Sequence, residues 1–234
     1  MGKVFQFKEF TIAQDQCAMK IGTDGVLLGA WLPLKNENSI LDIGTGTGLI
    51  ALMLAQRSGA ETIDAIEIDA KAFEQAVVNF ENSHWKDLLF CYHASFQEFY
   101  EEITDLYELI VSNPPFYTSK YKSENTERNK ARFEESLPFE NLFEGVSKLL
   151  KKNGKFAMIA PYQEENKLIE TAFAHQLQIQ KVCRVRGNEK APIKRSLLLF
   201  GFENKKVVYE SLVLETQRHV YTEEYGALVK DFYL

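Results

Sequence analysis

The sequence predicts an α/β fold with a doubly wound, mostly parallel seven-stranded sheet that carries one antiparallel strand. Three observations support this prediction. Short apolar runs alternate five times with helix-length segments, which is typical of parallel strands joined by crossover helices. The first apolar run ends in a glycine-rich turn, as expected where a strand meets a helix at a ligand site. Near the C-terminus two apolar runs follow each other without a helix-length segment between them, which favours an antiparallel pair.

The expected strands are apolar runs bounded by polar or turn residues. The parallel strands cover residues 39–43, 62–68, 88–93, 106–112 and 155–160. The antiparallel pair covers residues 177–186 and 195–202, and residues 207–214 are a candidate for an additional edge strand.

The expected helices follow these strands. Residues 49–57 come directly after the glycine-rich turn. Asp69 is a candidate N-cap for the next helix, in which Phe73, Ala76, Val77 and Phe80 recur at the spacing of one helix face. A further helix is expected over residues 164–175, and Thr222 is a candidate cap for a last helix that runs to Val229.

The segment after the fourth strand differs from the rest. Residues 113–135 are polar and weakly periodic, so we expect a long loop with a short helix. Pro138 then suits a first helical turn, and Gly154 suits a C-terminal stop. The apolar residues that share one face of the helix between them are Phe139, Leu142, Phe143, Val146, Leu149 and Leu150.

Composition and charge are those of an ordinary globular protein. The chain has 234 residues, of which 45% are hydrophobic and 26% charged; this excludes disorder and predicts a single domain, residues 1–234. The longest apolar stretch, residues 25–34, is too short to span a membrane, and the N-terminus lacks an apolar signal core. The cysteines and histidines show neither disulfide nor metal-ligand spacing. We therefore expect a cytoplasmic protein without a metal site.

A candidate nucleoside-cofactor site surrounds the glycine-rich turn. Gly44, Gly46 and Gly48 alternate with threonines, of which Thr45 is the first. Glycine lets the backbone approach a ligand closely, and a helix N-terminus offers free N–H groups. Glu67 ends the second expected strand, 19 residues after Gly48, where a carboxylate can accept both ribose hydroxyls.

Asp42, two residues before the turn, helps to distinguish between cofactors. The dinucleotide fingerprint is GxGxxG, whereas the third glycine here comes one residue early. A carboxylate also fits poorly beside a pyrophosphate but suits a cofactor with an ammonium group. S-adenosyl-L-methionine therefore fits this turn better than a dinucleotide, which is the main alternative.

A second candidate site is the turn Asn113-Pro114-Pro115-Phe116, which follows the fourth expected strand. Two prolines by themselves indicate only a rigid end to a strand. They do not account for the asparagine before them or the aromatic residue after them. This turn and the glycine-rich turn both follow parallel strands, whose carboxyl ends form the ligand-binding edge of such sheets.

The acidic residue, the GxGxG turn and the acid at the end of the next strand resemble the class I methyltransferases, which have a Rossmann-like fold. The resemblance implies that the turn embraces the methionyl and ribose portions of S-adenosyl-L-methionine. The family position that contacts the adenine amino group, often Asp, is occupied here by Ser95, and Phe96 follows it.

The turn Asn113 to Phe116 resembles the signature of amino-methyltransferases that act on a planar nitrogen. The resemblance implies that the Asn113 side-chain oxygen and the Pro114 carbonyl accept the two N–H hydrogens of the target amine. Phe116 is then placed to stack on the base, which is worth about 1–3 kcal/mol in single-stranded nucleic acids. Proximity and orientation supply most of the rate enhancement.

The N-terminal segment makes the resemblance more specific. Residues 10–31, with Lys20-x-Gly-Thr23-Asp24-Gly inside them, resemble the opening of the bacterial tRNA1(Val) (adenine-N6)-methyltransferases, and the likeness extends along nearly the whole chain. It implies that residues 1–37 cap the cofactor, that residues 38–234 form the catalytic core, and that the partner is the anticodon loop of a tRNA. Lys20, Thr23 and Asp24 are further cofactor candidates, the alternative being a capping segment with a turn at residues 22–25.

Two other functions remain open at this point. Glutamine methyltransferases of peptide release factors use the same Asn-Pro-Pro-aromatic turn, but they normally carry a helical substrate domain, and only about forty residues precede the glycine turn here. A non-catalytic RNA-binding module on the same fold is the alternative from another class.

Two basic segments interrupt a chain whose formal net charge is −6. One follows the Asn-Pro-Pro turn and the other joins the last two strands of the predicted pair. Their placement indicates a local phosphate-binding rim, although charge runs are often only solvated loops. The RNA-binding candidates are Lys120, Lys122, Arg128, Lys130, Arg132, Arg184, Arg186, Lys190, Lys194 and Arg195.

Overall fold

The computed structural model describes residues 4–17, 20–115 and 137–234. Its centre is a sheet in the strand order β10-β8-β9-β7-β6-β3-β4-β5. All neighbouring strands are parallel except that β9 is antiparallel to both β7 and β8. The strands are β3 (Ser39–Ile43), β4 (Thr62–Glu67), β5 (Leu89–His93), β6 (Tyr107–Ser112), β7 (Leu150–Pro161), β8 (Gln178–Arg186), β9 (Ile193–Gly201) and β10 (Val208–Val213).

This topology confirms the predicted doubly wound sheet with its single antiparallel strand. The sheet of the described residues has one strand more than the seven predicted, because the candidate edge strand is present as β10, which pairs in parallel with β8. Two small antiparallel pairs lie outside the sheet. They are β1 (Val4–Gln6) with β2 (Thr11–Ala13), and β11 (Glu215–Gln217) with β12 (Val220–Tyr221).

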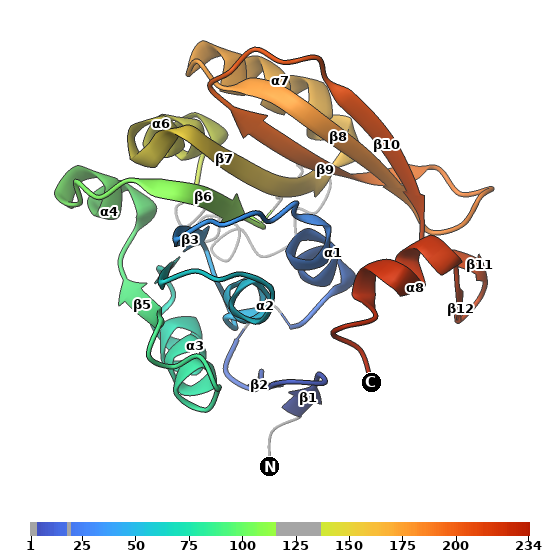
Figure 1. Ribbon diagram of the computed structural model, residues 1–234, viewed down its shortest axis with the longest axis horizontal. Coiled ribbons are helices and arrows are strands. Elements are labelled where there is room, and N and C mark those ends of the chain that lie inside the picture. The colour runs from blue at the N-terminus through green and yellow to red at the C-terminus, as the bar shows by residue number, and fades with distance from the viewer. Residues whose placement is uncertain (1–3, 18–19, 116–136) are drawn as a thin grey trace, which may run out of the picture.

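Helices cover both faces of the sheet (Figure 1). One face carries α1, α2, α3 and α8, and the other carries α4, α6 and α7. These helices are α1 (Thr23–Trp31), α2 (Leu49–Arg57), α3 (Ala70–Glu81), α4 (Phe96–Glu102), α6 (Phe139–Leu149), α7 (Glu165–Ala174) and α8 (Glu223–Val229), with a short 3-10 turn, η2 (Tyr162–Glu164), before α7.

The alternation of side chains along each strand divides the core into two layers. In β7, for example, Ala157 and Ile159 face the α1–α2 layer, whereas Phe156 and Met158 face the α6–α7 layer. All four side chains are fully buried. Strands buried on both faces explain why the sequence shows continuous apolar runs.

Two caps confirm the helix boundaries that the sequence predicts. The Asp69 side chain accepts a hydrogen bond from the Ala72 N–H, and the Thr222 side chain accepts one from the Tyr225 N–H. The buried face of α3 is rotated relative to the prediction. Ala76 and Phe80 are buried, but Phe73 and Val77 are only partly so, since Gln75 and Asn79 take part of the buried face.

The prediction that Gly154 stops a helix was wrong. Helix α6 begins after its N-cap Pro138 and ends at Leu149, and Leu150 already pairs with Tyr107 in the sheet. The pairing of β6 with β7 is irregular here, since Tyr107 pairs with Leu150 but Leu109 pairs with Lys155, just after Gly154. A Cβ on Gly154 would lie 2.9 Å from the Lys151 carbonyl oxygen and 3.0 Å from that of Glu108. Glycine is therefore needed inside a strand, where two backbones approach closely.

The alternative of a turn over residues 22–25 was also wrong, because α1 begins at Thr23 with Gly22 as its N-cap. The expected loop over residues 113–135 lies almost entirely outside the described residues, and so does Phe116.

Candidate active site

Three chain segments leave the sheet side by side at its carboxyl edge. Ile43 of β3 pairs with Ile66 of β4 on one side and with Ser112 of β6 on the other. The next residues are Gly44, Glu67 and Asn113 respectively. Because neighbouring strands lie about 4.8 Å apart, the glycine turn, the strand-end acid and the Asn-Pro-Pro turn start next to one another, as the sequence predicts.

The glycine turn has the backbone geometry that requires glycine. Gly44, Gly46 and Gly48 have φ values of 71°, 58° and 81°, in the left-handed region that other residues rarely adopt. A Cβ on Gly48 would lie 2.5 Å from the Phe80 ring, so this glycine is also needed for packing. A Cβ on Gly44 or Gly46 would meet no described atom within 4 Å, which leaves open space beside the turn.

Backbone hydrogen bonds fasten the turn to the end of β4. The N–H groups of Gly44 and Thr45 both donate to the Ile66 carbonyl, at 2.9 and 3.0 Å. The Glu67 carboxylate accepts from the Gly46 N–H at 2.8 Å through Oε2 and from the Asp69 N–H at 2.9 Å through Oε1. The Glu67 side chain, largely buried, is thus held in one orientation beside the turn.

Asp42 lies beneath the turn and is fully buried. Its Oδ2 accepts a hydrogen bond from the Thr45 hydroxyl at 2.6 Å, whereas Oδ1 forms no hydrogen bond of ordinary geometry with the described residues. Burial raises the pKa of this carboxyl to about 7, although hydrogen bonds from the Thr45 hydroxyl and the Ala51 backbone N–H oppose the shift. A buried carboxylate without an ion-pair partner favours a cation nearby.

The Asn113 turn is joined to the glycine turn through β3 and to the N-terminal segment through α1. The Ser112 hydroxyl donates to the Ile43 carbonyl at 2.9 Å. A Cβ on Gly25 of α1 would lie 2.9 Å from Leu49 Cδ2 and 3.9 Å from Asn113 Nδ2. Asn113 is partly buried, Pro114 is buried and Pro115 is exposed. Helix α1 therefore backs both candidate turns.

Ser95 and Phe96 have local partners. Ser95 caps α4, since its hydroxyl accepts from the Glu98 N–H at 3.2 Å and its N–H donates to the Glu98 carboxylate at 3.0 Å. This S-x-x-E capping box is visible in the sequence. The Phe96 side chain is buried against Tyr100, so at this position only the backbone and the Ser95 side chain remain near the edge of the sheet.

Two candidates assigned to different ligands form an ion pair. Asp24, a cofactor candidate on α1, accepts a hydrogen bond at 2.7 Å from the Nε of Arg195, an RNA candidate on β9. Lys20 and Thr23 are exposed near the start of the same helix. The ion pair ties the N-terminal segment to the antiparallel strand.

Arg184, a second RNA candidate, is also engaged with protein groups. Its guanidinium donates to the buried Glu165 carboxylate, with the shortest distance 2.7 Å, and lies 5.5 Å from the ring centres of Tyr162 and Tyr209. Glu165 also accepts a hydrogen bond from the Ser196 hydroxyl at 2.5 Å. Sequence reasoning missed this network because its members come from separate elements.

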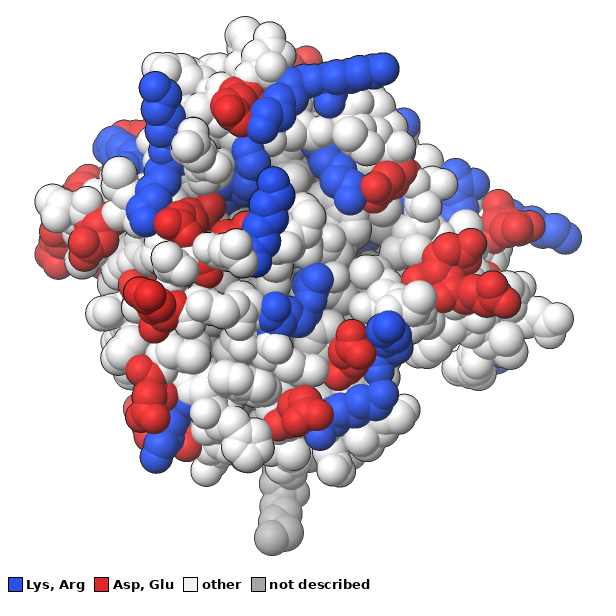
Figure 2. All heavy atoms as spheres, viewed as in Figure 1, with Lys and Arg blue, Asp and Glu red and all other residues white. Residues whose placement is uncertain are grey.

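The remaining basic candidates of this segment surround the β8–β9 connection. Arg186 is partly exposed, and Lys190 and Lys194 are exposed. Since β8 runs in the same direction as β7, this connection lies at the same edge of the sheet as the two turns. Figure 2 shows positive and negative side chains interspersed over the visible face rather than one broad positive field. The candidates Lys120, Lys122, Arg128, Lys130 and Arg132 lie outside the described residues.

Sequence reasoning also missed two buried amides on α3. Asn79 forms hydrogen bonds with the Ala13 backbone and with the Thr47 carbonyl in the glycine turn. Gln75 accepts a hydrogen bond from the Gln16 N–H at 3.0 Å. The sequence signal that could have revealed them is the pair of amides four residues apart, each directly before an apolar residue, Ala76 or Phe80.

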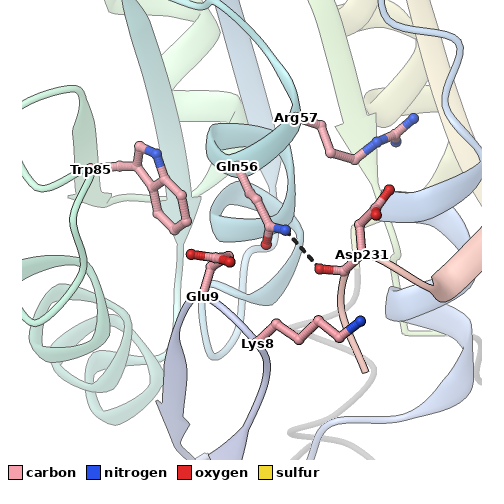
Figure 3. A pocket seen from close by; sticks show the side chains of 6 residues that line it. All are labelled: Lys8, Glu9, Gln56, Arg57, Trp85 and Asp231. Atoms are coloured by element: carbon pink, nitrogen blue, oxygen red, sulfur yellow. Dashed lines mark hydrogen bonds between the residues drawn. The ribbon is translucent and has the colours of Figure 1, made fainter. Parts of the chain in front are cut away.

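A cavity of about 620 Å³ lies at the other end of α2, away from the glycine turn (Figure 3). Its polar groups serve to hold the chain ends together. Gln56 donates to the Asp231 carbonyl at 2.8 Å, and Arg57 donates to the Gly29 and Leu32 carbonyls. The Lys8 ammonium donates to the Lys230 carbonyl. The cavity therefore lies where the N-terminal hairpin, α2 and the C-terminal residues meet.

Within residues 4–17, 20–115 and 137–234, no group of three or more histidine, cysteine or acidic side chains has the arrangement needed to hold a metal ion. None of the helices in these ranges is sufficiently long and apolar to cross a membrane.

Comparison with known proteins identifies similar chains. Residues 17–185 match the Methyltransferase small domain family. A protein of Christiangramia forsetii named tRNA1(Val) (adenine(37)-N6)-methyltransferase is 57% identical, over 98% of this chain and 97% of that protein. A protein of the same name from Bacteroides fragilis is 44% identical, over 98% of this chain and 97% of that one.

Solved structures show the same fold at low sequence identity. A predicted O-methyltransferase from Agrobacterium tumefaciens aligns with a TM-score of 0.69 and 17% identity, over 89% of this chain and 96% of that one. A putative RNA methyltransferase from Pyrococcus horikoshii aligns with a TM-score of 0.52 and 14% identity, over 76% and 79% of the two chains. These likenesses support the class I methyltransferase architecture.

Proposed function

Because the chain belongs to the Methyltransferase small domain family and, within it, to the tRNA1(Val) (adenine(37)-N6)-methyltransferases, we propose that it methylates the N6 amine of an adenine in tRNA with S-adenosyl-L-methionine. The adenine is at position 37 of tRNA1(Val), next to the anticodon. A tRNA substrate implies that the enzyme works in the cytoplasm. The whole chain acts as one domain, in which residues 1–37 cap the cofactor and residues 38–234 form the catalytic core.

The residues of the glycine turn fit the cofactor. The open space beside Gly44 and Gly46 leaves room for a ligand against the backbone, and the Asp42 carboxylate, fully buried just before the turn, attracts an ammonium group through its charge. Glu67 is held beside the turn, within reach of ribose hydroxyls. S-adenosyl-L-methionine supplies an electrophilic methyl group. Lys20, Thr23, Ser95 and the Phe96 backbone are further contacts that we propose on the family resemblance.

Asn113 and Pro114 hold the target amine. An exocyclic amine of adenine is a weak nucleophile, because its lone pair is delocalised into the ring. The Asn113 side-chain oxygen and the Pro114 carbonyl accept its two N–H hydrogens, which favours a pyramidal nitrogen with its lone pair directed at the methyl group. Pro115 stiffens the turn, and Phe116 stacks on the base. Positioning in this way is the main catalytic contribution of the chain.

A loop adenine suits a compact enzyme without a separate recognition domain. Bases in single-stranded loops can be splayed out and stacked on aromatic side chains at modest cost. The described cations that we assign to tRNA phosphates are Arg186, Lys190 and Lys194, because Arg184 and Arg195 are already paired with Glu165 and Asp24. The basic candidates between Lys120 and Arg132 complete this proposed rim.

The observation that carries the proposal is the common row of Ile66, Ile43 and Ser112, from which Glu67, Gly44 and Asn113 emerge together. The test is methyl transfer to unmodified tRNA by wild type, Asn113→Ala and Asn113→Asp. Loss of one preorganised hydrogen-bonding group typically costs about 10²–10³-fold in kcat, so we expect that loss for Asn113→Ala. Asn113→Asp keeps an acceptor oxygen and should retain more activity.

Cofactor affinity is the control, and it should not change in either variant. Equal turnover by wild type and Asn113→Ala would remove Asn113 from the mechanism. Methyl incorporation into a protein glutamine, with none in tRNA, would favour the glutamine methyltransferase alternative. Binding of tRNA without any methyl transfer would favour the RNA-binding module.

A further inference from the structure

The side chain of Asn79 joins the N-terminal segment to the glycine turn. Its Oδ1 accepts the Ala13 N–H at 2.9 Å, while Nδ2 donates to the Ala13 carbonyl at 3.0 Å and to the Thr47 carbonyl at 2.8 Å. Asn79 is only 3% exposed. Both N–H hydrogens and the oxygen are therefore used, and they connect three chain segments that are distant in sequence.

Thr47 is the residue of the glycine turn that the Asn79 side chain restrains. It lies between Gly46 and Gly48, which both have positive φ values. Glycine loses more conformational freedom on ordering than any other residue, so a flexible turn would lower the affinity for a ligand that needs one geometry. A buried hydrogen bond to the Thr47 carbonyl fixes the turn before the ligand arrives.

Ala13 is the point at which the N-terminal segment is fixed. One helical turn before Asn79, Gln75 accepts the Gln16 N–H at 3.0 Å, so α3 holds the segment at two places. Cys17 follows and is buried, and its pKa is raised to about 11, by burial first and then by the nearby Glu67 carboxylate. Helix α3 therefore holds the N-terminal segment at two points, Ala13 and Gln16.

We propose that Asn79 is a positioning residue for cofactor binding, which acts by fixing the glycine turn and the N-terminal segment relative to each other. This inference rests on the proposed use of S-adenosyl-L-methionine. An amide is the side chain required, because it is short and offers two donors and an acceptor. Aspartate has almost the same shape but cannot donate to the two carbonyls.

The test compares wild type, Asn79→Asp and the control Asn82→Ala. Asn82 is at the end of the same helix, is exposed, and donates only to the Val78 carbonyl within that helix. S-adenosyl-L-methionine affinity is measured by calorimetry, and methyl transfer gives kcat and the KM values for cofactor and tRNA. Circular dichroism checks that each variant is folded. If Asn79→Asp does not fold, Asn79→Ser replaces it in the same comparison.

Asn79→Asp should raise the cofactor Kd and KM about tenfold or more, since about 1.4 kcal/mol corresponds to a factor of ten. The kcat at saturating cofactor and the KM for tRNA should stay within about threefold of wild type, because Asn79 touches neither the tRNA nor the reacting atoms in this proposal. Asn82→Ala should match wild type in all of these quantities.

An unchanged cofactor Kd in a folded variant would overturn the inference, since Asn79 would then only stabilise the fold. A fall in kcat with no change in cofactor KM would overturn it as well. Failure of the proposed function is distinguishable: wild type itself would then bind no S-adenosyl-L-methionine, or would bind it without methylating tRNA. In the second case the affinity comparison for Asn79 remains decisive.

Discussion

The two ends of the carboxyl edge hold their polar side chains in different ways. Around β3 and β4, the turn and Glu67 are bound to backbone groups: Glu67 accepts two N–H groups, and Gly44 and Thr45 donate to one carbonyl. Around β8 and β9, Arg184 and Arg195 are bound to carboxylates of α7 and α1. The first end is fixed by backbone geometry, whereas the second depends on ion pairs and exposed charges.

The two ways of holding side chains suit different ligands. Backbone hydrogen bonds within a tight turn preorganise a small ligand site, and they are insensitive to salt. Exposed cations on a connection between strands attract a polyanion, and salt weakens their effect strongly. The division agrees with a cofactor at one end and tRNA phosphates at the other.

The largest effect is expected for Gly48→Ala, at the end fixed by backbone geometry. A positive φ costs a residue other than glycine about 1–2 kcal/mol, and a Cβ 2.5 Å from the Phe80 ring adds about 1–3 kcal/mol of overpacking. The free energy of unfolding should fall by about 2–5 kcal/mol in denaturant titrations. Gly59→Ala, whose Cβ would meet no described atom within 4 Å, is the control. Equal stability of the two variants would contradict the strain at Gly48.

A smaller effect, with a defined pH dependence, is expected for Asp42→Asn. The folded protein holds a proton on Asp42 up to about pH 7, whereas an unfolded aspartate loses it near pH 4. The folded state therefore binds more protons between these values, and stability falls as the pH rises through that range. Between pH 5 and pH 8 wild type should lose about 2–3 kcal/mol from this group, since one pKa unit corresponds to about 1.4 kcal/mol.

The Asn variant should lack this loss, which is checked by unfolding wild type and variant in urea at both pH values. Cofactor affinity provides a second measurement. An ionised Asp42 is needed to pair with an ammonium group, so the affinity of wild type should rise with pH towards 7 and above, and that of Asp42→Asn should not. If stability and cofactor affinity depended on pH in the same way in wild type and Asp42→Asn, Asp42 would be responsible for neither pH dependence.

The smallest effect is expected at the end that depends on exposed charges. The double variant Lys190→Ala, Lys194→Ala removes two cations from the β8–β9 connection, at the carboxyl edge of the sheet. The tRNA Kd at low salt should rise about tenfold, and the slope of log Kd against log salt concentration should decrease by about one to two. The control pair is Lys152→Ala with Lys206→Ala, since both lysines are exposed and belong to the opposite edge of the sheet. Identical salt slopes for the two double variants would remove the β8–β9 connection from the RNA interface.

Local signals account for most of the fold that could be predicted. Asp69 and Thr222 satisfy N–H groups within three residues of themselves, so their effect on helix starts is readable in the chain. Gly154 misled the prediction because a glycine looks the same whether it ends a helix or permits two strands to approach. The contact that decides between them involves the Glu108 carbonyl, which is distant in sequence.

Prediction of the candidate site was limited in the same way, by contacts between residues that are distant in sequence. Asp42, Gly46 and Glu67 were predicted together because a strand, a turn and a second strand bring them together within one βαβ unit. Arg195 and Asp24 were assigned to different ligands, since nothing near either residue identifies the other as its partner. Asn79 was overlooked because the predicted buried face of the helix consisted of apolar residues only and did not include this position.

Hydrophobic period and turn chemistry within short stretches are sufficient to predict the parallel sheet, the turn at Gly44 to Gly48 and the position of Asn113 at the end of its strand. The folded arrangement is needed to tell which cations remain available for a ligand and which side chains fix the turn. Hydrogen bonds and ion pairs depend on distances of about 3 Å, and such distances between α1 and β9, or between α3 and residue 13, exist only after the chain has folded.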